Sequence, residues 1–287
     1  MTDHRSSDPI RYSRSALVPG AEMVTAERCN HSFPQRFHST VLMVVMVVAG
    51  AVRIAYSDDS SYVLKAGSVV VIEPTEVYSA APAGEEGWSY RAFGLPVELV
   101  FKVARNILGY REQSGPVFTT RIIQDDDDVY RRLTRAHRML EAGDDSLAAQ
   151  TALDDGLSTL LERYAIELKA EFEVVEPGTS DAPPIAKMIW RLTEDMAERV
   201  SLEEVAESAG WTKFHADRTF REEIGLSPFE WRTIVRLERS LALLEAGESL
   251  ADVALSCGFT DQAHFTNNFK AVFGVPPGKW RAQLAAM

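Results

Sequence analysis

The chain is poor in the features that mark secreted and membrane proteins. Its 287 residues include only two cysteines, Cys29 and Cys257, in different regions, so no disulfide framework is expected and a reducing cytoplasm fits. The first fifteen residues are polar and contain no apolar signal core. The most apolar run, residues 41–52, is too short to span a bilayer, and its β-branched content predicts a buried strand.

The length is sufficient for two domains that each have a core. Residues 11–95 contain many short apolar segments separated by turns, among them two expected strands at residues 41–48 and 51–56 on either side of Gly50, and they predict a β-sandwich or barrel. Two helices are expected at residues 125–143 and 146–171, and the acidic residues 125–128 are sufficiently explained as the solvated start of the first helix. VVEPGTSDAPP at residues 174–184 has the composition of a linker. The expected fold class is therefore α+β, with an N-terminal domain at residues 10–173 and an all-helical domain at residues 185–287.

The C-terminal part contains one unit twice. SLEEVAESAGWTKFHADRTFREEIGLSPFEWR occupies residues 201–232, and SLADVALSCGFTDQAHFTNNFKAVFGVPPGKWR occupies residues 249–281. In each copy a capping serine, a short apolar helical face, a glycine and a second helix follow in the same order. These are the parts of a helix-turn-helix, so two are expected. The alternative is a pair of structural helical hairpins, as in a solenoid protein. Two copies are too few to form a solenoid, and a long helix joins them.

The joining segment, residues 227–245, is expected to be one helix, with a first helix of this domain at residues 185–200. A rod of this length spans roughly 28 Å. Successive major-groove faces on one side of DNA lie about 34 Å apart. The second helix of each unit is the expected recognition helix, and the joining rod holds the two at nearly the spacing of adjacent major grooves. Because the rod is slightly shorter than that spacing, we expect that the DNA bends or that one helix docks less fully.

Positive charge is scarce for a DNA-binding protein. The whole chain has a formal net charge of −12, and from residue 185 onward twelve Lys and Arg stand against fifteen Asp and Glu. Binding must then depend on a local basic face. The candidates for that face are Lys213, Arg218, Arg221, Lys270, Lys279 and Arg281.

The second copy and its flank, GESLADVALSCGFTDQAHFTNNFKAVFGVPPGKWR, resemble the DNA-binding domain of the AraC/XylS family of bacterial transcription regulators. The resemblance places base contacts in the first copy at Phe214, Asp217 and Arg218, flanked by Lys213 and Arg221. Arg218 can contact guanine at two points, and Asp217 can accept from a cytosine amino group. In the second copy the corresponding positions hold Gln262, Ala263, His264 and Asn267, and Lys270 is expected to contact phosphate.

The N-terminal strands resemble the cupin-like effector-binding domain found ahead of AraC-type DNA-binding domains. This resemblance rests on FPQRFHST, GAVRI, LKAGSVVVIEPTEVYSA and EEGWSYRAFGLP in this order. A metal cupin has two histidines in its first motif and another in the second, whereas this chain has His38 in the first and Tyr78 in the second. No metal or other cofactor is therefore expected. His38 is as well explained as an ordinary core or rim histidine.

We expect the barrel to bind a small organic effector. Arg36, His38, Tyr78 and Tyr90 are the candidate contacts, and Val44, Met46 and Val71 are expected to wall the pocket. Arg36 would favour a carboxylate-bearing ligand; the alternative is that its side chain points to solvent. The resemblance implies a cytoplasmic, sequence-specific DNA-binding regulator, with activation favoured by family habit, RNA polymerase as a partner and a homodimer formed through the helical pair. The alternative is a cupin enzyme whose C-terminal helices only bind a partner.

Overall fold

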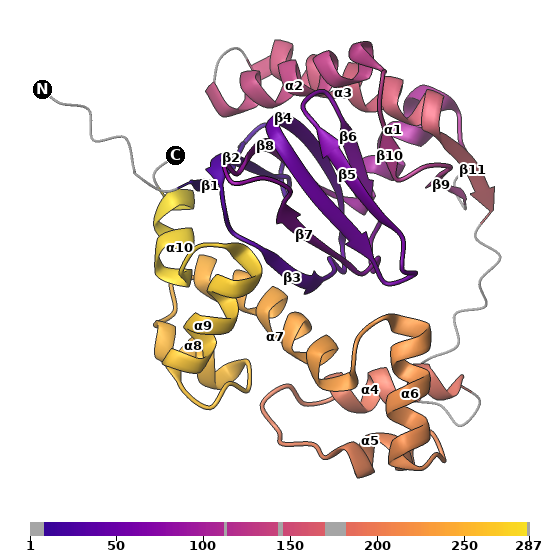
Figure 1. The fold of residues 1–287 in the computed structure, drawn as a ribbon, viewed down its shortest axis with the longest axis vertical. Helices are drawn as coiled ribbons and strands as arrows, with labels where there is room; N and C mark the ends of the chain where they lie inside the picture. Colours follow the sequence, from indigo (N-terminus) through magenta and orange to yellow (C-terminus); the bar gives the residue numbers. More distant parts are fainter. Residues whose placement is uncertain (1–8, 112–113, 143–145, 170–181, 286–287) are drawn as a thin grey trace, which may run out of the picture.

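The computed structural model describes residues 9–111, 114–142, 146–169 and 182–285. A curved sheet with helices over one face forms the first part, and a helical part lies against the other side of the sheet (Figure 1). The first eight strands are β1 (Ile10–Arg14), β2 (Glu22–Cys29), β3 (Phe33–Arg36), β4 (Val41–Tyr56), β5 (Ser61–Lys65), β6 (Val69–Ile72), β7 (Tyr78–Pro82) and β8 (Trp88–Pro96). The remaining strands are β9 (Ser114–Phe118), β10 (Ile122–Ile123) and β11 (Ala165–Lys169).

Nine of the described strands form one antiparallel sheet. Its main order is β1-β2-β8-β4-β6-β10, and β5 and β7 pair with the second half of β4, with β3 on β7. Side chains from both halves meet in an interior core that includes Val45, Ile54, Tyr78 and Tyr90. The two-domain α+β class and the barrel-like N-terminal domain expected from the sequence are confirmed.

The sequence predicted two strands, at residues 41–48 and 51–56, where the structure has the single strand β4. Its register against β8 shifts between Val47 and Ala49, and Gly50 adopts a φ of 71°, which favours glycine. A Cβ at Gly50 would also collide with the Gly87 carbonyl. This bulge bends β4, so that its first half pairs with β6 and β8 and its second half with β5 and β7. The prediction of two separate strands was wrong because Gly50 was interpreted as the end of a strand and not as part of a bulge.

Three helices cover the outer face of the sheet (Figure 1). They are α1 (Val97–Leu108), α2 (Asp127–Ala142) and α3 (Ser146–Tyr164). Val44, Met46 and Val71 pack in the core beneath these helices, not in the barrel interior. The prediction that they wall a pocket was wrong, because neighbouring strand residues point to opposite faces; Met43, Val45 and Ile72 face inward instead.

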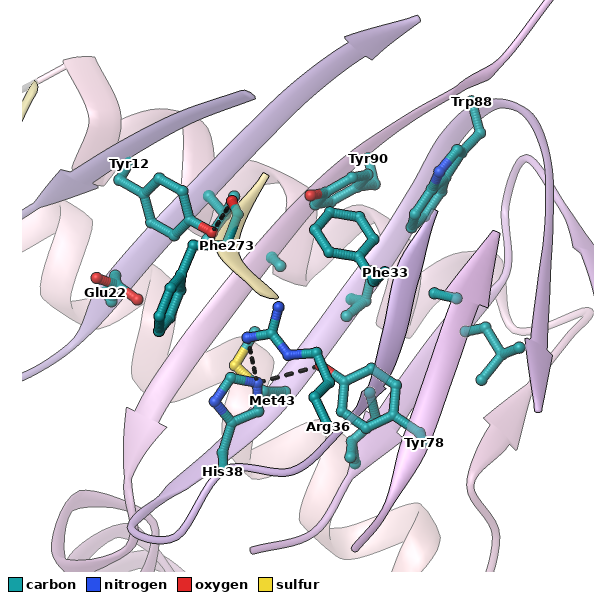
Figure 2. Close-up of a pocket in the computed structure, with 16 residues that line it drawn as sticks. Tyr12, Glu22, Phe33, Arg36, His38, Met43, Tyr78, Trp88, Tyr90 and Phe273 are labelled. Atoms are coloured by element: carbon teal, nitrogen blue, oxygen red, sulfur yellow. Dashed lines mark hydrogen bonds between the residues drawn. The ribbon is translucent and has the colours of Figure 1, made fainter. Parts of the chain in front are cut away.

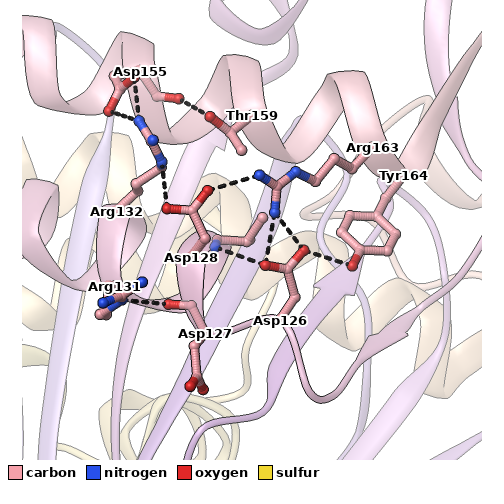
Figure 3. Close-up of polar contacts among 10 residues, drawn as sticks. Asp126, Asp127, Asp128, Arg131, Arg132, Asp155, Thr159, Arg163 and Tyr164 are labelled. Atoms are coloured by element: carbon pink, nitrogen blue, oxygen red, sulfur yellow. Dashed lines mark hydrogen bonds and ion pairs between the residues drawn. The ribbon is translucent and has the colours of Figure 1, made fainter.

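The acidic residues 125–128, at the start of α2, connect α2 to α3 through hydrogen bonds and ion pairs (Figure 3). Asp126 accepts hydrogen bonds from Arg163 Nη1 at 2.8 and 2.9 Å and from Tyr164 Oη at 2.8 Å. Asp128 pairs with Arg163 and Arg132, and Arg132 also pairs with Asp155 on α3. These carboxylates therefore do more than begin a solvated helix.

The predicted helix at residues 146–171 extends too far, since α3 ends at Tyr164 and the chain continues as β11, which pairs with β9. Strands β9 and β10 and helix α1 were not predicted. The two strands are too short to have a periodic pattern of their own. Helix α1 has an amphipathic pattern, with Val100, Val103 and Ala104 buried, that could have indicated it. Most of the predicted linker, residues 174–181, lies outside the described residues. Pro184 at its end already begins the next helix.

The second part is built from seven described helices. They are α4 (Pro184–Thr193), α5 (Leu202–Ser208), α6 (Lys213–Ile224), α7 (Pro228–Glu245), α8 (Leu250–Ser256), α9 (Gln262–Phe273) and α10 (Pro277–Ala285). A capping box begins α5 at Ser201, and Ser249 caps α8 by accepting from the Asp252 amide, as the two copies of the repeat predict. Ser227 begins the joining helix α7, also with a capping box. The first helix is shorter than the predicted residues 185–200.

The two helix-turn-helix units differ in their cores. The first unit, α5 and α6 with α4, has a core of its own around Leu192, Val205 and Phe220. The core of the second unit, around Phe269 and Trp280, is continuous with the interior of the barrel. Cys257 is buried in this core, as its match to a small residue of the first copy predicts. Among the described residues no helix is long and apolar enough to cross a membrane.

Candidate DNA-binding surface and effector pocket

Helix α6 exposes the side chains expected to contact DNA in the first unit. Thr212 caps its N-terminus by accepting from the His215 amide, and Ala216 and Phe220 face the core. This orientation leaves Phe214 79% exposed, which is unusual for a large apolar side chain. The side chain of Arg218 is 70% exposed.

The cations of this surface have different partners. Lys213 pairs with Glu203 at 2.7 Å. Arg221 pairs with Asp217 at 3.1 Å and with Glu230 at 3.3 Å, and so links α6 to α7. Among the described residues, the ion pair of Arg218 is the long contact of 3.8 Å with Glu222. Arg218 therefore loses the weakest intramolecular ion pair of the three cations when its side chain binds DNA.

Helix α9 presents the second candidate set. Asp261 caps it by accepting from the His264 amide at 2.8 Å, and Phe265 and Phe269 face the core. Gln262, His264, Asn267 and Lys270 are all exposed. Arg281, expected on phosphate, is half-buried and donates to the Glu248 carbonyl at 2.6 Å, so it holds α10 against the end of α7.

A cavity of about 60 Å³ lies inside the barrel, and all four predicted effector contacts line it (Figure 2). Arg36 is 6% exposed, so it does not point to solvent. The other lining residues come from β1–β4 and β6–β8, with one from α9: Tyr12, Glu22, Val24, Phe33, Met43, Val45, Ile54, Ile72, Ala80, Trp88, Ala92 and Phe273. Tyr12, Glu22 and Trp88 were not predicted to line the cavity, although inward alternation along their strands could have indicated them.

Arg36, His38 and Tyr78 form one polar cluster in this cavity (Figure 2). Arg36 Nη2 and Tyr78 Oη each lie 3.1 Å from His38 Nε2. A guanidinium can only donate, so His38 Nε2 accepts and the neutral ring carries its proton on Nδ1, which faces Glu238 of α7 at 3.8 Å. Burial and the neighbouring Arg36 charge hold the pKa of His38 well below its usual value.

Glu22 and Trp88 add unpaired polar atoms to the cavity. Burial raises the pKa of Glu22 to about 7, partly offset by the charges of Arg14 and Arg36. Glu22 Oε1, Arg36 Nε and Trp88 Nε1 are buried without a hydrogen-bond partner. The described His, Cys, Asp and Glu residues form no group of three or more that could hold a metal ion. The cavity therefore combines an aromatic body with free donors and one free acceptor.

Comparison with known proteins identifies the family. Residues 19–157 match the model of the AraC-like ligand binding domain, and residues 205–283 match that of a helix-turn-helix domain. The chain belongs to the AraC family of transcription regulators. It is an AraC-type DNA-binding regulator with an N-terminal ligand-binding domain.

Relatives agree with this assignment. The chain is 26% identical to YbfI of Bacillus subtilis, an uncharacterized HTH-type transcriptional regulator, over 81% of both chains. It is 33% identical to the multiple antibiotic resistance protein MarA of Escherichia coli over 36% of this chain and 81% of MarA. ToxT of Vibrio cholerae has the same fold, with a TM-score of 0.57 at 14% identity over 92% of this chain and 97% of ToxT. One ToxT structure holds an unsaturated fatty acid and matches with a TM-score of 0.53.

Proposed function

We propose that this AraC-family protein binds promoter DNA with α6 and α9 and responds to a small organic effector in the barrel cavity. The observation that supports the DNA contacts is the exposure of Phe214 and Arg218 on a capped helix whose opposite face is packed. Lys213, Asp217 and Arg221 flank them, and Gln262, His264, Asn267 and Lys270 are the second set. Family habit favours activation through RNA polymerase.

The effector assignment rests on the cavity itself. Arg36, His38, Tyr78 and Tyr90 converge on a space with aromatic walls, and several of its buried polar atoms lack partners. Concave, mostly apolar sites with a few convergent polar groups are where small ligands bind. A carboxylate-bearing lipid is compatible with this chemistry, as the fatty acid found in ToxT suggests.

We also propose that the protein is a cytoplasmic homodimer without catalytic activity, with α2 and α3 at the dimer interface. The proposal of no enzyme activity follows from the donor set, since His38, Tyr78 and Arg36 lack the second histidine that a metal cupin needs. Elemental analysis of purified protein tests it. Stoichiometric iron, zinc or manganese that is lost in His38→Ala would overturn the metal-free proposal and support the enzyme alternative.

Promoter binding with and without candidate effectors tests the main proposal. We expect a mobility shift of DNA from the region around the protein's own gene, with an apparent affinity that changes when the cognate effector is added. Arg218→Ala is the matched control, because it leaves the cavity intact and should lose the shift. Binding that is identical for promoter and random DNA would contradict the proposal.

A further inference from the structure

The C-terminal turn of α9 is held by donors from the N-terminal domain. The last carbonyls of a helix have no partner within it. In α9 the Lys270 carbonyl accepts from the Gly274 amide. The next three carbonyls accept from the barrel side: Ala271 from His31 Nε2 at 2.8 Å, Val272 from Arg36 Nη1, and Phe273 from Tyr12 Oη at 2.8 Å.

One of these donors belongs to the cavity cluster. Arg36 reaches from the cavity to the Val272 carbonyl and lies 5.4 Å from the centre of the Phe273 ring. A cation at a helix C-terminus is favourable, because the partial charge there is negative. Phe273 is in turn the cavity's one lining residue from the helical part of the described chain. The recognition helix of the second unit thus forms part of the cavity wall.

Arg36 is a buried cation whose described hydrogen-bond partners are neutral, although the carboxyl groups of Glu22 and Glu238 interact with its charge from a greater distance. Its described hydrogen bonds go to a carbonyl and to an imidazole, and none of the ion pairs among the described residues includes it. Its Nε is buried without a partner. Buried charges are normally paired with an opposite charge. A carboxylate in this cavity would supply that charge, with the aromatic rings of Tyr90 and Trp88 packing on its body.

The cavity is too small for such a ligand while α9 stays in place. Its volume of about 60 Å³ is well below the roughly 300–1,000 Å³ of ligand pockets. Most of its walls are hydrogen-bonded strands, whereas Phe273 is attached to the barrel through side-chain contacts. Arg36 has five N–H groups, of which two have described acceptors, so it can offer a carboxylate a two-point contact through Nε and one Nη. The competition with α9 therefore comes from the space that Phe273 occupies in the cavity.

We propose that an organic carboxylate with an apolar body binds at Arg36 and competes with the C-terminal turn of α9, so that its binding releases the second helix-turn-helix unit from the barrel. The inference rests on the proposed function of the cavity as the effector site. The protein then has two alternative states: in one the second helix-turn-helix unit is docked on the barrel, and in the other the carboxylate occupies the cavity. Each state disfavours the other. Coupling of this kind is reciprocal: whatever weakens docking must strengthen carboxylate binding.

Docking can be weakened outside the cavity. Arg14 pairs with Glu245 of α7 at 2.5 Å. Gln283 of α10 accepts from the Tyr12 amide at 2.9 Å and donates to the Ile10 carbonyl at 3.2 Å. Neither Arg14 nor Gln283 lines the cavity. The double variant Arg14→Gln/Gln283→Ala therefore loosens docking and removes no cavity-lining side chain. Because the charge of Arg14 acts on Glu22, which lines the cavity, the single variant Gln283→Ala is measured beside it and should change the affinity in the same direction. Arg132→Gln on α2 is the matched control.

The experiment is calorimetric titration of the full chain with benzoate, phenylacetate and octanoate, each paired with its neutral amide. At least one carboxylate should bind roughly tenfold more tightly than its amide. The double variant should bind that carboxylate roughly fivefold more tightly than wild type, with Arg132→Gln unchanged. If no carboxylate binds more tightly than its amide, the proposal that the ligand is an anion is wrong.

Hydrogen exchange of the wild-type protein gives a second measurement that needs no variant. A saturating carboxylate should increase amide exchange in β1 and α10. Unchanged or slower amide exchange in β1 and α10 would contradict the proposed competition between the carboxylate and α9. An unchanged affinity of a folded double variant for the carboxylate would contradict it as well. The effector assignment would still stand in that case if the same carboxylate altered promoter binding, so the two proposals fail separately.

Discussion

Replacement of Arg218 by alanine separates recognition of DNA from stability of the fold. Its side chain is 70% exposed and its one described ion pair, with Glu222, is 3.8 Å long. A pair of this kind contributes about 0–1 kcal/mol, so the variant should unfold within about 0.5 kcal/mol of wild type. A two-point contact with a base contributes about 1–3 kcal/mol of discrimination. We therefore expect specific affinity to fall roughly 5- to 150-fold while folding is preserved.

The assay is fluorescence anisotropy with promoter DNA and with random DNA of equal length at fixed salt, together with denaturant unfolding. Arg218→Ala should weaken promoter binding and relax preference at one base position, and leave random binding nearly unchanged. Lys270→Ala is the contrast, because loss of a phosphate contact should weaken both DNAs alike and reduce the salt dependence. Equal losses on both DNAs for Arg218→Ala would refute its assignment as a base-contacting residue.

Three further predictions concern the two repeats and the polar clusters. Alanine scans should show larger losses of specific binding across residues 214–218 than across residues 262–267, where Asn267 stands in place of a cation; equal losses would contradict this asymmetry. The raised pKa of Glu22, about 7 in the folded chain, means that its contribution to stability is complete below pH 4.5 and is lost as the pH rises through 7. Unfolding free energy should thus fall by roughly 1–3 kcal/mol between pH 5 and 8, and Glu22→Gln should remove that slope; a slope that persists would show that another group causes it. The pKa of Asp126 is lowered to about 2, chiefly by Arg163, against an opposing effect of burial. Asp126→Asn should cost about 1 kcal/mol at pH 7, and this difference from wild type should disappear as the pH falls from 4 through 2; chemical unfolding at both ends of that range measures it.

The helical half was predictable from the sequence except for its first helix, α4, which ends at Thr193 and not at residue 200. Both recognition helices begin at the residues that their caps indicate, Thr212 and Asp261, and α7 begins after Ser227. Capping and helix periodicity are local properties, so nearby residues suffice to determine them. The length of α3 was overestimated for a related reason, since nothing local reveals that β11 pairs with β9 across the chain.

The barrel was harder to predict, because its geometry depends on register. Met43 and Val44 are equally apolar neighbours, yet only Met43 faces the cavity. Arg36, His38 and Tyr78 were identified from the motif positions that the family resemblance supplied, and the structure places them in contact with one another. The contribution of Phe273 to the cavity could not be predicted, because it depends on how the second helix-turn-helix unit packs against β1 and β3.

Selection of the purified full-length protein's binding sites from a random DNA library tests the central claim most directly. Two recognition helices on one rigid α7 should enrich sequences with two short conserved blocks whose centres lie about 10 base pairs apart. The block lost in an Arg218→Ala selection should be the one contacted by α6. Enrichment of no sequence over the starting library, or of a single block that is unaffected by both Arg218→Ala and Asn267→Ala, would contradict the account.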